Sequence, residues 1–397
     1  MAILVLNSGS SSVKFALVDA ESGDRTFDGI AERLGTPGAT FTSRIAGQAM
    51  TDALRPGDHR RAVDVMIERL RAAGQDGGVR AIGHRVVHGG ERFSDAVVVD
   101  DAVEAAIEAA ARLAPLHNRA NLLGIRAARG AFPHLPQVAV FDTAFHHAMP
   151  PRAFRYAVPE PWYREHGVRK YGFHGTSHRY VAERAATRLG RPLAELELLT
   201  AHLGNGCSAC AIRRGKSVDT TMGLTPLAGL VMGTRSGDVD PSVVDYMAGQ
   251  RGTGADAITG ELNERSGLLG LSGLSNDMRS LLEARARGHE GAALAVDVFC
   301  QRLAGSLLAL AASLERLDAI VFTGGIGEHA APVRAEVIAK LWPFGARVDD
   351  AANARHGAPT GMISPPGTVS ICVIATDEEH MIAIDAARVT GLAAPHE

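Results

Sequence analysis

Residues 3–18 read Ile-Leu-Val-Leu-Asn-Ser-Gly-Ser-Ser-Ser-Val-Lys-Phe-Ala-Leu-Val, and this opening stretch indicates the fold class. Its two apolar runs, 3–6 and 13–18, have the composition of β-strands, and the small polar segment between them holds a glycine suited to a turn. The pattern predicts a β-hairpin. A second strand–turn–strand segment of the same kind lies at Thr200–Ile212. This echo favours two copies of one mixed α/β unit, and a cleft between two such lobes is a natural place for a ligand.

The rest of the chain alternates between the periodicities of helices and strands. Ser177 and Asp240 are expected to be N-caps, the second followed by a proline at the first helical position, and prolines at 149–151 and 159–161 indicate a domain junction. The expected elements, in order, are helix 60–73, strand 79–83, helices 101–113 and 118–129, strand 137–141, a helix from Ser177 to Leu189, strands 196–203 and 207–212, a helix after Asp240, helix 291–314, strand 318–322, a further helix, strand 369–375 and helix 377–388.

Length and composition limit the class of protein. A chain of 397 residues exceeds what one hydrophobic core usually organises, so two domains are expected. Hydrophobic residues make up 46% and charged residues 21%, and the net charge is −3 without a long basic stretch, which argues against a nucleic-acid or membrane-surface partner. The chain opens on a strand-like run instead of a secretion signal, and no uninterrupted apolar stretch approaches membrane-spanning length. We expect a cytoplasmic protein.

The four cysteines are too few for a disulfide-stabilised secreted fold, which also favours a reducing compartment. Cys207 and Cys210 form a CxxC pair in the predicted strand 207–212, where residues i and i+3 point to opposite faces. No second cysteine pair or nearby histidine adds metal ligands, and the chain has no HExxH pattern. We expect both cysteines to be small buried residues and not a zinc or redox site.

Three turns rich in Gly, Ser or Asn come directly after predicted strands, at Asn7–Ser12, Gly204–Gly206 and Gly324–Glu328. Backbone N–H groups exposed in such turns suit phosphate oxygens, although none of the three matches a Walker A loop or a Rossmann fingerprint. Any one of these turns alone is better explained as a plain tight turn, and the three together favour a nucleotide site. Lys14 beside the first turn is either a phosphate contact or a solvated edge-strand lysine.

Two arginines and one aspartate are candidates for an anion site. Arg85 stands at the end of a predicted strand before a glycine pair, and Arg235 stands among small residues. Arginine binds phosphate or carboxylate through two parallel hydrogen bonds. The alternative for each is a structural ion pair. Asp142 follows strand 137–141 at its carboxyl end, where α/β sites form, and it could equally cap a helix.

Histidines gather in the middle of the chain, at positions 146, 147, 174, 178 and 202. His174 lies between glycines in a predicted loop, which is unlike a core histidine. Near the end of the chain, the carboxylates of Ala375–Glu379 fall at the first turn of a predicted helix. They either stabilise the helix dipole or bind magnesium.

Four ordered segments resemble the acetate kinase family of the acetate and sugar kinase, Hsc70 and actin superfamily. The likeness runs essentially end to end. The segments are Leu6-Asn-Ser-Gly-Ser-Ser-Ser-Val-Lys-Phe15, Gly83-His-Arg-Val-Val-His-Gly-Gly90, Tyr171-Gly-Phe-His-Gly-Thr-Ser-His178 and His202-Leu-Gly-Asn-Gly206. The resemblance implies a two-lobed α/β fold of duplicated ribonuclease-H-like (actin-like ATPase) units with an interdomain active-site cleft. We expect an N-terminal lobe of residues 1–147 plus 380–397 and a C-terminal nucleotide-binding lobe of residues 148–379.

The resemblance also implies roles for residues, cofactors and partners. Mg²⁺, with Mn²⁺ as a substitute, would be held by Asn7 and Glu378, and Lys14 would contact the nucleotide side. Arg85 would bind the substrate, Asp142 is the family's active-site residue, and His174 and Arg235 would stabilise the transition state. ATP or ADP would be held by His202, Leu203, Gly204, Asn205 and Gly206, by Asp277, Met278 and Arg279, and by Gly325, Ile326, Gly327, Glu328 and His329. The family pattern ends in Asn where this chain has His329. The methyl group of acetate would lie among Val87, Leu116, Phe173 and Pro226.

The implied reaction is reversible, Mg-dependent phosphoryl transfer between ATP and acetate, giving acetyl phosphate and ADP, by a homodimer in acetyl-CoA biosynthesis. Such transfer spreads charge over three equatorial oxygens, so positioning and cations carry the catalysis. Acetate is already ionised at neutral pH and needs no base. We therefore expect Asp142 to organise the cations and not to accept a proton.

Two other functions stay open at this point. One is a propionate or other short-chain acyl kinase of the same family. The other, from a different class, is an actin-like or chaperone-like ATPase, which predicts a partner-binding extension for which 397 residues leave no room.

Overall fold

The computed structural model describes residues 1–9 and 11–392, with the side chains of Pro115 and Leu116 outside the description. These residues form two compact units. Unit 1 is Met1–His147 together with the chain from Asp377, and unit 2 is Ala148–Thr376. The return to unit 1 begins at Asp377 instead of the expected residue 380, and Asp377 pairs with Arg25 of unit 1 at 2.6 Å.

Unit 1 is built on an eight-stranded sheet with the strand order β5-β4-β3-β2-β1-β6-β8-β7. The predicted opening hairpin is present as the antiparallel pair β1 and β2, whereas β1, β6 and β8 run parallel. The strands are β1 (Ala2–Ser8), β2 (Ser12–Asp19), β3 (Arg25–Glu32), β4 (Thr40–Ile45), β5 (Gln48–Ala53), β6 (Val79–Val86), β7 (Val97–Val98) and β8 (Gln137–Phe141). The helices are α1 (His59–Ala72), α2 (Asp101–Ala110), α3 (Pro115–Ala131) and α15 (Glu378–Val389), with 3-10 turns η1 (Asp76–Gly78) and η2 (Ala144–Ala148).

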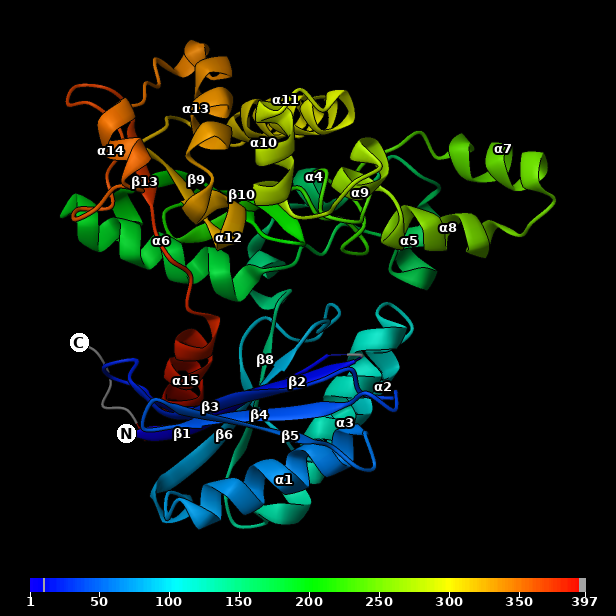
Figure 1. Cartoon of the computed structure of the whole chain (residues 1–397), viewed down its shortest axis with the longest axis vertical. Helices are drawn as coiled ribbons and strands as arrows, with labels where there is room; N and C mark the ends of the chain where they lie inside the picture. Colours follow the sequence, from blue (N-terminus) through cyan, green and yellow to red (C-terminus); the bar gives the residue numbers. More distant parts are fainter. Residues whose placement is uncertain (10, 393–397) are drawn as a thin grey trace. The chain divides into compact units, whose positions relative to one another are not determined.

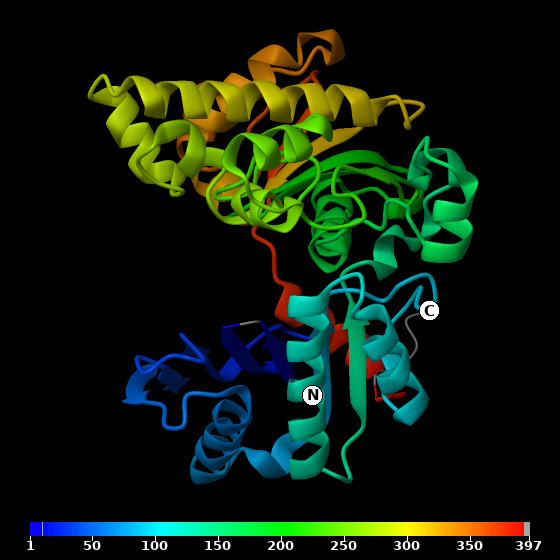
Figure 2. The same cartoon turned by 90° about the vertical axis from the view of Figure 1, so that its right-hand side faces the viewer.

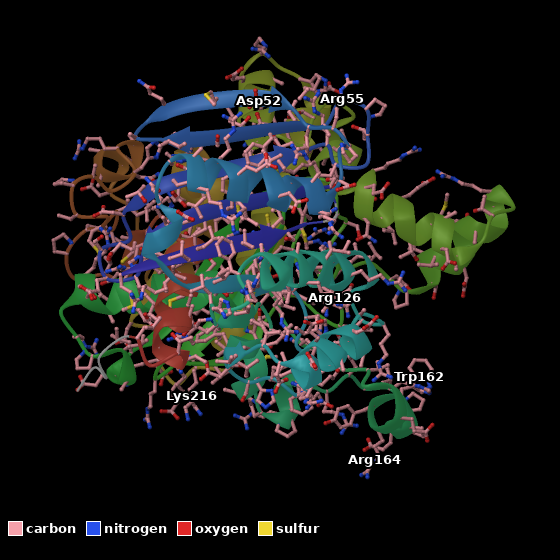
Figure 3. All side chains as sticks on the ribbon, turned by 90° about the horizontal axis from the view of Figure 1, so that it is seen from below. Asp52, Arg55, Arg126, Trp162, Arg164 and Lys216 are labelled. Atoms are coloured by element: carbon pink, nitrogen blue, oxygen red, sulfur yellow. The ribbon has the colours of Figure 1, made fainter. Side chains whose placement is uncertain are left out.

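The two faces of this sheet carry separate cores because side chains alternate along a strand. Leu4 and Leu6 of β1 join the cluster of α1 and α3, whereas Ile3 and Val5 join that of α15. Figure 1 shows α1 and α3 on one face of the sheet and α15 on the other. On the surface seen in Figure 3, Arg126 of α3 pairs with Glu104 of α2 at 2.9 Å.

Unit 2 repeats the central part of this plan. Its five-stranded sheet has the order β11-β10-β9-β12-β13, with β9 antiparallel to β10 and parallel to β12. The same arrangement links β3-β2-β1-β6-β8 in unit 1, so the repeated strand–turn–strand pattern reflects a repeated topology. The strands are β9 (Glu197–Leu203), β10 (Cys207–Arg213), β11 (Lys216–Thr220), β12 (Ala319–Thr323) and β13 (Ser370–Val373).

The helices of unit 2 cover both faces of its sheet, with α6 on one face and the long α11 on the other (Figure 2). They are α4 (Pro151–Phe154), α5 (Glu160–His166), α6 (Gly175–Leu189), α7 (Ser242–Arg251), α8 (Ala255–Glu264), α9 (Gly267–Ser272), α10 (Met278–Ala286), α11 (Glu290–Ala311), α12 (Gly324–His329), α13 (Ala331–Lys340) and α14 (Asp350–Ala354), with 3-10 turns η3 (Leu193–Glu195) and η4 (Trp342–Phe344).

Two predicted helix starts were wrong. Helix α6 begins at Gly175, because His174 takes a left-handed conformation with φ 57° and precedes the first turn. Ser177 lies inside the helix, and its hydroxyl bonds to His202 Nδ1 at 2.8 Å instead of capping. Helix α7 begins at Ser242, one residue later than expected.

Helix α11 is the one described helix that is long and apolar enough, by length and composition alone, to cross a membrane. It contains Asp297 and Arg302, so it is not an uninterrupted apolar stretch. Nine of its residues are buried, and it packs on β9 and β10 and against α9, α10 and α13. This is the environment of a core helix.

Candidate active site

Four predicted site residues that lie in unit 1, Arg85, Asp142, Asn7 and Glu378, form one cluster at the ends of β1, β6 and β8. Arg85 donates to both carboxylate oxygens of Asp142, from Nε at 2.9 Å and from Nη2 at 2.6 Å. Its Nη1 donates to Asn7 Oδ1 at 3.3 Å, and its Nε lies 3.7 Å from Glu378 Oε2. Neighbouring parallel strands bring the first three residues together, and the first turn of α15 supplies the fourth. The structure thus gathers four residues that are far apart in the sequence.

Burial and pairing act in opposite directions on this cluster. The Asp142 side chain is only 2% exposed, and this burial raises the pKa of its carboxyl group, while Arg85 opposes the rise. Burial lowers the pKa of the Arg85 guanidinium, but Asp142 and Glu378 outweigh that effect and raise it. The two parallel hydrogen bonds are those of an ionised carboxylate with a guanidinium. Asp142 therefore holds Arg85 in a fixed plane.

Lys14 is placed by the register of the opening hairpin. It lies directly opposite Asn7 in the β1–β2 pair, and residues opposite each other point to the same face of the sheet. Its side chain is exposed. Ser10, in the turn between these strands, lies outside the described residues.

Two asparagines of α3, which the sequence reading missed, fix the chain beyond Arg85. Asn121 Oδ1 accepts from Val87 N at 3.1 Å, and Asn118 Oδ1 accepts from His88 N at 3.1 Å. Asn121 Nδ2 also donates to the carbonyl of Ser8, at the end of β1. Val87, predicted for the acyl pocket, is buried at 8% exposure. The side chain of Leu116, predicted for the same pocket, lies outside the described part of the chain.

In unit 2, His174 lies at the start of α6 beside the Gly204–Gly206 turn. Its Nδ1 is hydrogen-bonded to Ser208 Oγ at 2.8 Å, and its ring centroid is 4.3 Å from that of His202. A Cβ placed on Gly206 would lie 3.6 Å from His174 Nε2 and 3.2 Å from Arg235 Nη1. The two predicted transition-state stabilisers therefore converge on one turn.

Arg235 has neutral hydrogen-bond partners. Its Nη1 donates to the carbonyl of Pro226 at 3.3 Å and contacts Met232 Sδ at 3.7 Å. Within residues 1–9 and 11–392, no carboxylate forms an ion pair with it. Burial lowers the pKa of its guanidinium, which stays charged because arginine cannot be deprotonated in proteins. Pro226, predicted for the acyl pocket, is thus tied to Arg235, and Phe173 is buried next to His174.

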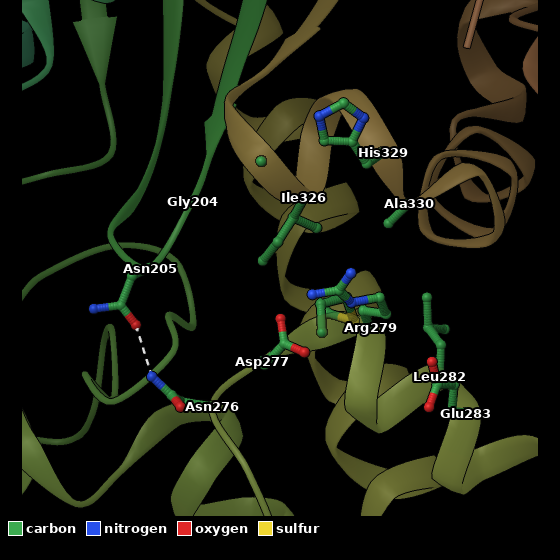
Figure 4. A pocket seen from close by; sticks show the side chains of 12 residues that line it. Gly204, Asn205, Asn276, Asp277, Arg279, Leu282, Glu283, Ile326, His329 and Ala330 are labelled. Carbon is green, nitrogen blue, oxygen red and sulfur yellow. Dashed lines mark hydrogen bonds between the residues drawn. The ribbon is translucent and has the colours of Figure 1, made fainter. Parts of the chain in front are cut away.

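A pocket of about 610 Å³ lies next to this turn, within unit 2. Figure 4 shows Asn205 and Asn276 on one side, Ile326 and His329 on another, and Asp277 and Arg279 between them. Asn276 Nδ2 donates to Asn205 Oδ1 at 3.1 Å, which holds the turn against the start of α10. The complete lining is Gly204, Asn205, Asn276, Asp277, Met278, Arg279, Leu282, Glu283, Gly325, Ile326, His329 and Ala330.

The lining overlaps the predicted nucleotide residues only in part. The predicted residues that do not line the pocket are Lys14, His202, Leu203, Gly206, Gly327 and Glu328. The remaining eight predicted residues do, and four that were not predicted join them: Asn276, Leu282, Glu283 and Ala330. Leu282 lies four residues after Met278, so helical periodicity along α10 was the missed signal.

Two predicted nucleotide residues have clear structural contacts. Glu328 Oε1 accepts from Gly324 N at 3.0 Å and so satisfies the backbone N–H of the first residue of α12. Asp277 caps α10, and hydrogen bonds from Ser280 lower the pKa of its carboxyl group. Cys207 and Cys210 are fully buried, as predicted, and burial raises the pKa of both thiols to about 12.

Oxygen ligands for a magnesium ion are available in unit 1. Asn7 and Glu378 contact the same guanidinium and offer an amide oxygen and a carboxylate, the ligand types that Mg²⁺ prefers. Among the described residues no group of three or more His, Cys, Asp or Glu side chains is placed to hold a metal. The residues fit a magnesium ion that takes few protein ligands and completes its shell with phosphate and water.

The sequence profile of the acetokinase family matches residues 2–384. The chain belongs to this family. A relative from Deinococcus radiodurans named acetate kinase is 55% identical over 389 residues, covering 98% of both chains. Acetokinase membership thus rests on nearly the full length of the chain.

Solved structures agree with this membership. A propionate kinase from Francisella tularensis superposes with a TM-score of 0.94 at 43% identity, covering 98% of this chain and 99% of the other. An acetate kinase from Porphyromonas gingivalis gives a TM-score of 0.91 at 41% identity, with the same coverage. The predicted actin-like α/β fold class is confirmed, and the family is one of kinases with a carboxyl group as acceptor.

Proposed function

We propose that this chain is an acetate kinase, which transfers a phosphoryl group reversibly between ATP and acetate to give acetyl phosphate and ADP. One observation carries the proposal. Arg235, a guanidinium without a carboxylate partner in the described residues, converges with His174 on the Gly206 turn beside the pocket of Figure 4. A partly buried cation held only by neutral groups is costly unless an anion joins it. A phosphate group of the nucleotide is that anion.

Unit 2 supplies the nucleotide site in this proposal. The backbone of Gly204–Gly206 approaches the phosphates, and the walls formed by Arg279, Ile326 and His329 hold the rest of the nucleotide. The charge that develops on the phosphoryl oxygens is stabilised by Arg235 and by a hydrogen bond from the His174 ring. Both groups are fixed before the reaction, so they need little reorganisation.

Unit 1 supplies the carboxylate site. Arg85 binds the carboxylate of acetate, and Asp142 keeps the guanidinium oriented through two hydrogen bonds. Because acetate is ionised at neutral pH, no residue has to remove a proton from it. Asp142 acts as an organiser of Arg85 and not as a base. Within this unit, Val87 is the proposed contact of the methyl group.

Magnesium is the proposed metal, with Mn²⁺ as a substitute. Asn7 and Glu378 would hold it, and Lys14 would contact the nucleotide side. A bound magnesium ion would neutralise phosphate charge.

The proposed biological setting is the one that the resemblance to the family implies. We propose a cytoplasmic homodimer that contributes acetyl phosphate to acetyl-CoA biosynthesis and has no nucleic-acid or membrane partner. Helix α7 supports a second copy as partner, because it has no buried residue and Tyr246 is 65% exposed. Sedimentation of the wild type and of Tyr246→Ser tests the dimer, since the variant should shift the equilibrium towards monomer.

A specific observation keeps a second function in view. The Francisella tularensis neighbour is named a propionate kinase, so a preference for propionate is the alternative within the family. Acyl phosphate formation from ATP with acetate, propionate and butyrate distinguishes the two. The highest kcat/KM with acetate supports the proposal. ATP hydrolysis that needs no carboxylate would instead indicate an actin-like or chaperone-like ATPase.

A further inference from the structure

Four polar groups of unit 2 form a continuous hydrogen-bonded chain that begins on His174. His174 Nδ1 lies 2.8 Å from Ser208 Oγ, and Ser208 Oγ lies 2.8 Å from His178 Nε2. His178 Nδ1 in turn lies 2.7 Å from Thr200 Oγ1. Ser208, His178 and Thr200 are each 0% exposed. We call these three residues the relay.

The fold brings the relay together from three elements. His178 lies in the first turns of α6 and His174 directly precedes the helix, and both rings bond to Ser208 Oγ. Thr200 lies on β9 and Ser208 on the antiparallel neighbour β10, on the sheet face that α6 covers. The two histidines therefore meet at one hydroxyl group, although the proposed reaction assigns a role only to His174.

The hydrogens of the relay must be arranged consistently, because a hydroxyl carries one hydrogen and a neutral imidazole carries one N–H. In the first arrangement Thr200 donates to His178 Nδ1, His178 Nε2–H donates to Ser208, and Ser208 donates to His174 Nδ1. The hydrogen of His174 is then on Nε2. In the second arrangement every donor reverses, and His174 Nε2 carries a lone pair.

Two observations favour the first arrangement. When every donor reverses, Thr200 must give its hydrogen to the carbonyl of Cys210, and that contact is 3.5 Å long, at the limit of a hydrogen bond. The Nε2 edge of His174 also faces the Gly206 turn, where Arg235 Nη1 converges on the same point. A lone pair there would repel phosphate oxygens, whereas an N–H would bind them.

We propose that the relay is a positioning device that keeps His174 Nδ1 without a hydrogen and presents Nε2–H to the phosphoryl group in transfer. The proposal rests on the proposed function for the identity of the anion, but the tautomer is a property of the protein alone. Ser208, His178 and Thr200 are positioning residues and do not touch the substrates.

The tautomer can be observed directly. In protein labelled with ¹⁵N-histidine, nitrogen–proton correlation spectra distinguish a ring nitrogen that carries hydrogen from one that does not, and the signals lost in His174→Gln identify His174. We expect Nε2 protonated and Nδ1 unprotonated in the full chain near neutral pH. A neutral ring protonated at Nδ1 would overturn the proposal.

Kinetics test whether the relay matters for turnover. Ser208→Ala removes the group that bonds to His174, so kcat for acyl phosphate formation should fall by roughly 10²-fold while KM for ATP and for acetate stays nearly constant. Thr200 is two hydrogen bonds further from His174 than Ser208 is, so Thr200→Val should lower kcat by roughly 10-fold. Thr200→Ser keeps the hydroxyl group and should have a kcat close to that of the wild type. The Thr200 pair keeps the test decisive if Ser208→Ala folds poorly.

Ser217→Ala is the matched control. Ser217 is also fully buried in the same sheet, and its hydroxyl contacts Cys210 Sγ at 3.3 Å. It should lose stability like the relay variants and keep kcat. If Ser208→Ala and Thr200→Val lower the melting temperature but leave kcat unchanged, the relay is only structural and the proposal fails. If the wild type forms no acyl phosphate from any carboxylate, the proposed function fails, and the spectra still decide the tautomer.

Discussion

The two candidate anion-binding arginines have opposite surroundings. Arg85 in unit 1 makes two hydrogen bonds to Asp142 and lies 3.7 Å from Glu378, so carboxylates balance its charge before any substrate arrives. Arg235 in unit 2 bonds to a carbonyl and a thioether sulfur, and no carboxylate among the described residues pairs with it. The carboxylates beside Arg85 fix the orientation of its guanidinium. The neutral groups around Arg235 leave its positive charge uncompensated, so that charge can attract an anionic ligand. One site is built for geometry and the other for charge.

Arg235→Met should show the largest effect on turnover. It removes the cation that faces the transferring phosphoryl group, and a comparable arginine in other phosphoryl-transfer enzymes contributes roughly 10³-fold or more. We expect kcat to fall by about that factor. The free energy of unfolding should not decrease, because the partly buried guanidinium of Arg235 has no anion to lose.

The exposed Arg265 of unit 2 provides a control for this change, since Arg265→Met also removes one positive charge. It should leave kcat unchanged. A stable Arg235→Met enzyme with near wild-type kcat would show that Arg235 does not stabilise the transferring phosphoryl group.

Arg85→Lys keeps the charge of unit 1 but loses the planar fork. Lysine cannot make the two parallel hydrogen bonds to Asp142 and also bind a carboxylate in a fixed plane. We expect kcat/KM for acetate to fall by roughly 10²-fold without unfolding. Steady-state kinetics with a thermal melt measure both quantities, and unchanged kinetics would remove Arg85 from the site.

Asp142→Asn separates orientation from charge. It leaves the Arg85 guanidinium without its main anion in a site where the Asp142 side chain was 2% exposed. Breaking a buried pair in this way costs about 3 kcal/mol of unfolding free energy, and turnover should fall with it. Chemical denaturation gives the energy. If the acid limb of wild-type activity has the same pKa for carboxylates of different acidity, Asp142 is a base and the organiser role is wrong.

Glu378→Gln should act on the metal requirement. The change keeps the size of the side chain and removes the carboxylate charge, so the Mg²⁺ concentration for half-maximal activity should rise several-fold. Glu379→Gln is the control, because Glu379 pairs with Arg25 at 3.0 Å. Equal responses of the two variants would make Glu378 only a charge at the start of α15.

Val87→Ala should have the smallest effect. If Val87 limits the acyl pocket, the variant should raise kcat/KM for propionate relative to acetate by roughly 3–10-fold, within the range for one methylene. Val86→Ala, on the buried strand β6, is the control for lost packing. A lowered melting temperature with an unchanged ratio would place Val87 in the core alone.

Local sequence signals predicted the elements that surround the site. The opening hairpin was predictable because its apolar runs and polar turn lie within 16 residues of each other, and Asn7 and Lys14 indeed face each other across it. Strands β3–β5 were missed because their exposed positions dilute the apolar pattern, as in the fully exposed β5. The alternation of apolar and polar residues reveals a strand in the sequence only when one face of that strand is buried.

Long-range partnerships could not be predicted from the residues. No spacing rule connects Arg85 with Asp142 and Glu378, because the strand order and the return of α15 bring them together. The same is true of Thr200, His178 and Ser208, which meet only when α6 packs on β9 and β10. Family resemblance named several of these residues, and the structure supplies the contacts that explain them.

The return of the chain to unit 1 has a consequence for biosynthesis. Ile382, Ala383 and Ala386 of α15 cover the face of the sheet that holds Ile3 and Val5. Unit 2 is one uninterrupted segment, Ala148–Thr376, so all of it is translated before α15 exists. During translation, this apolar face of the sheet therefore stays uncovered until α15 has left the ribosome. Unit 1 therefore completes its core later than unit 2, and a chain that stops before α15 would also lack Glu378, the proposed metal ligand.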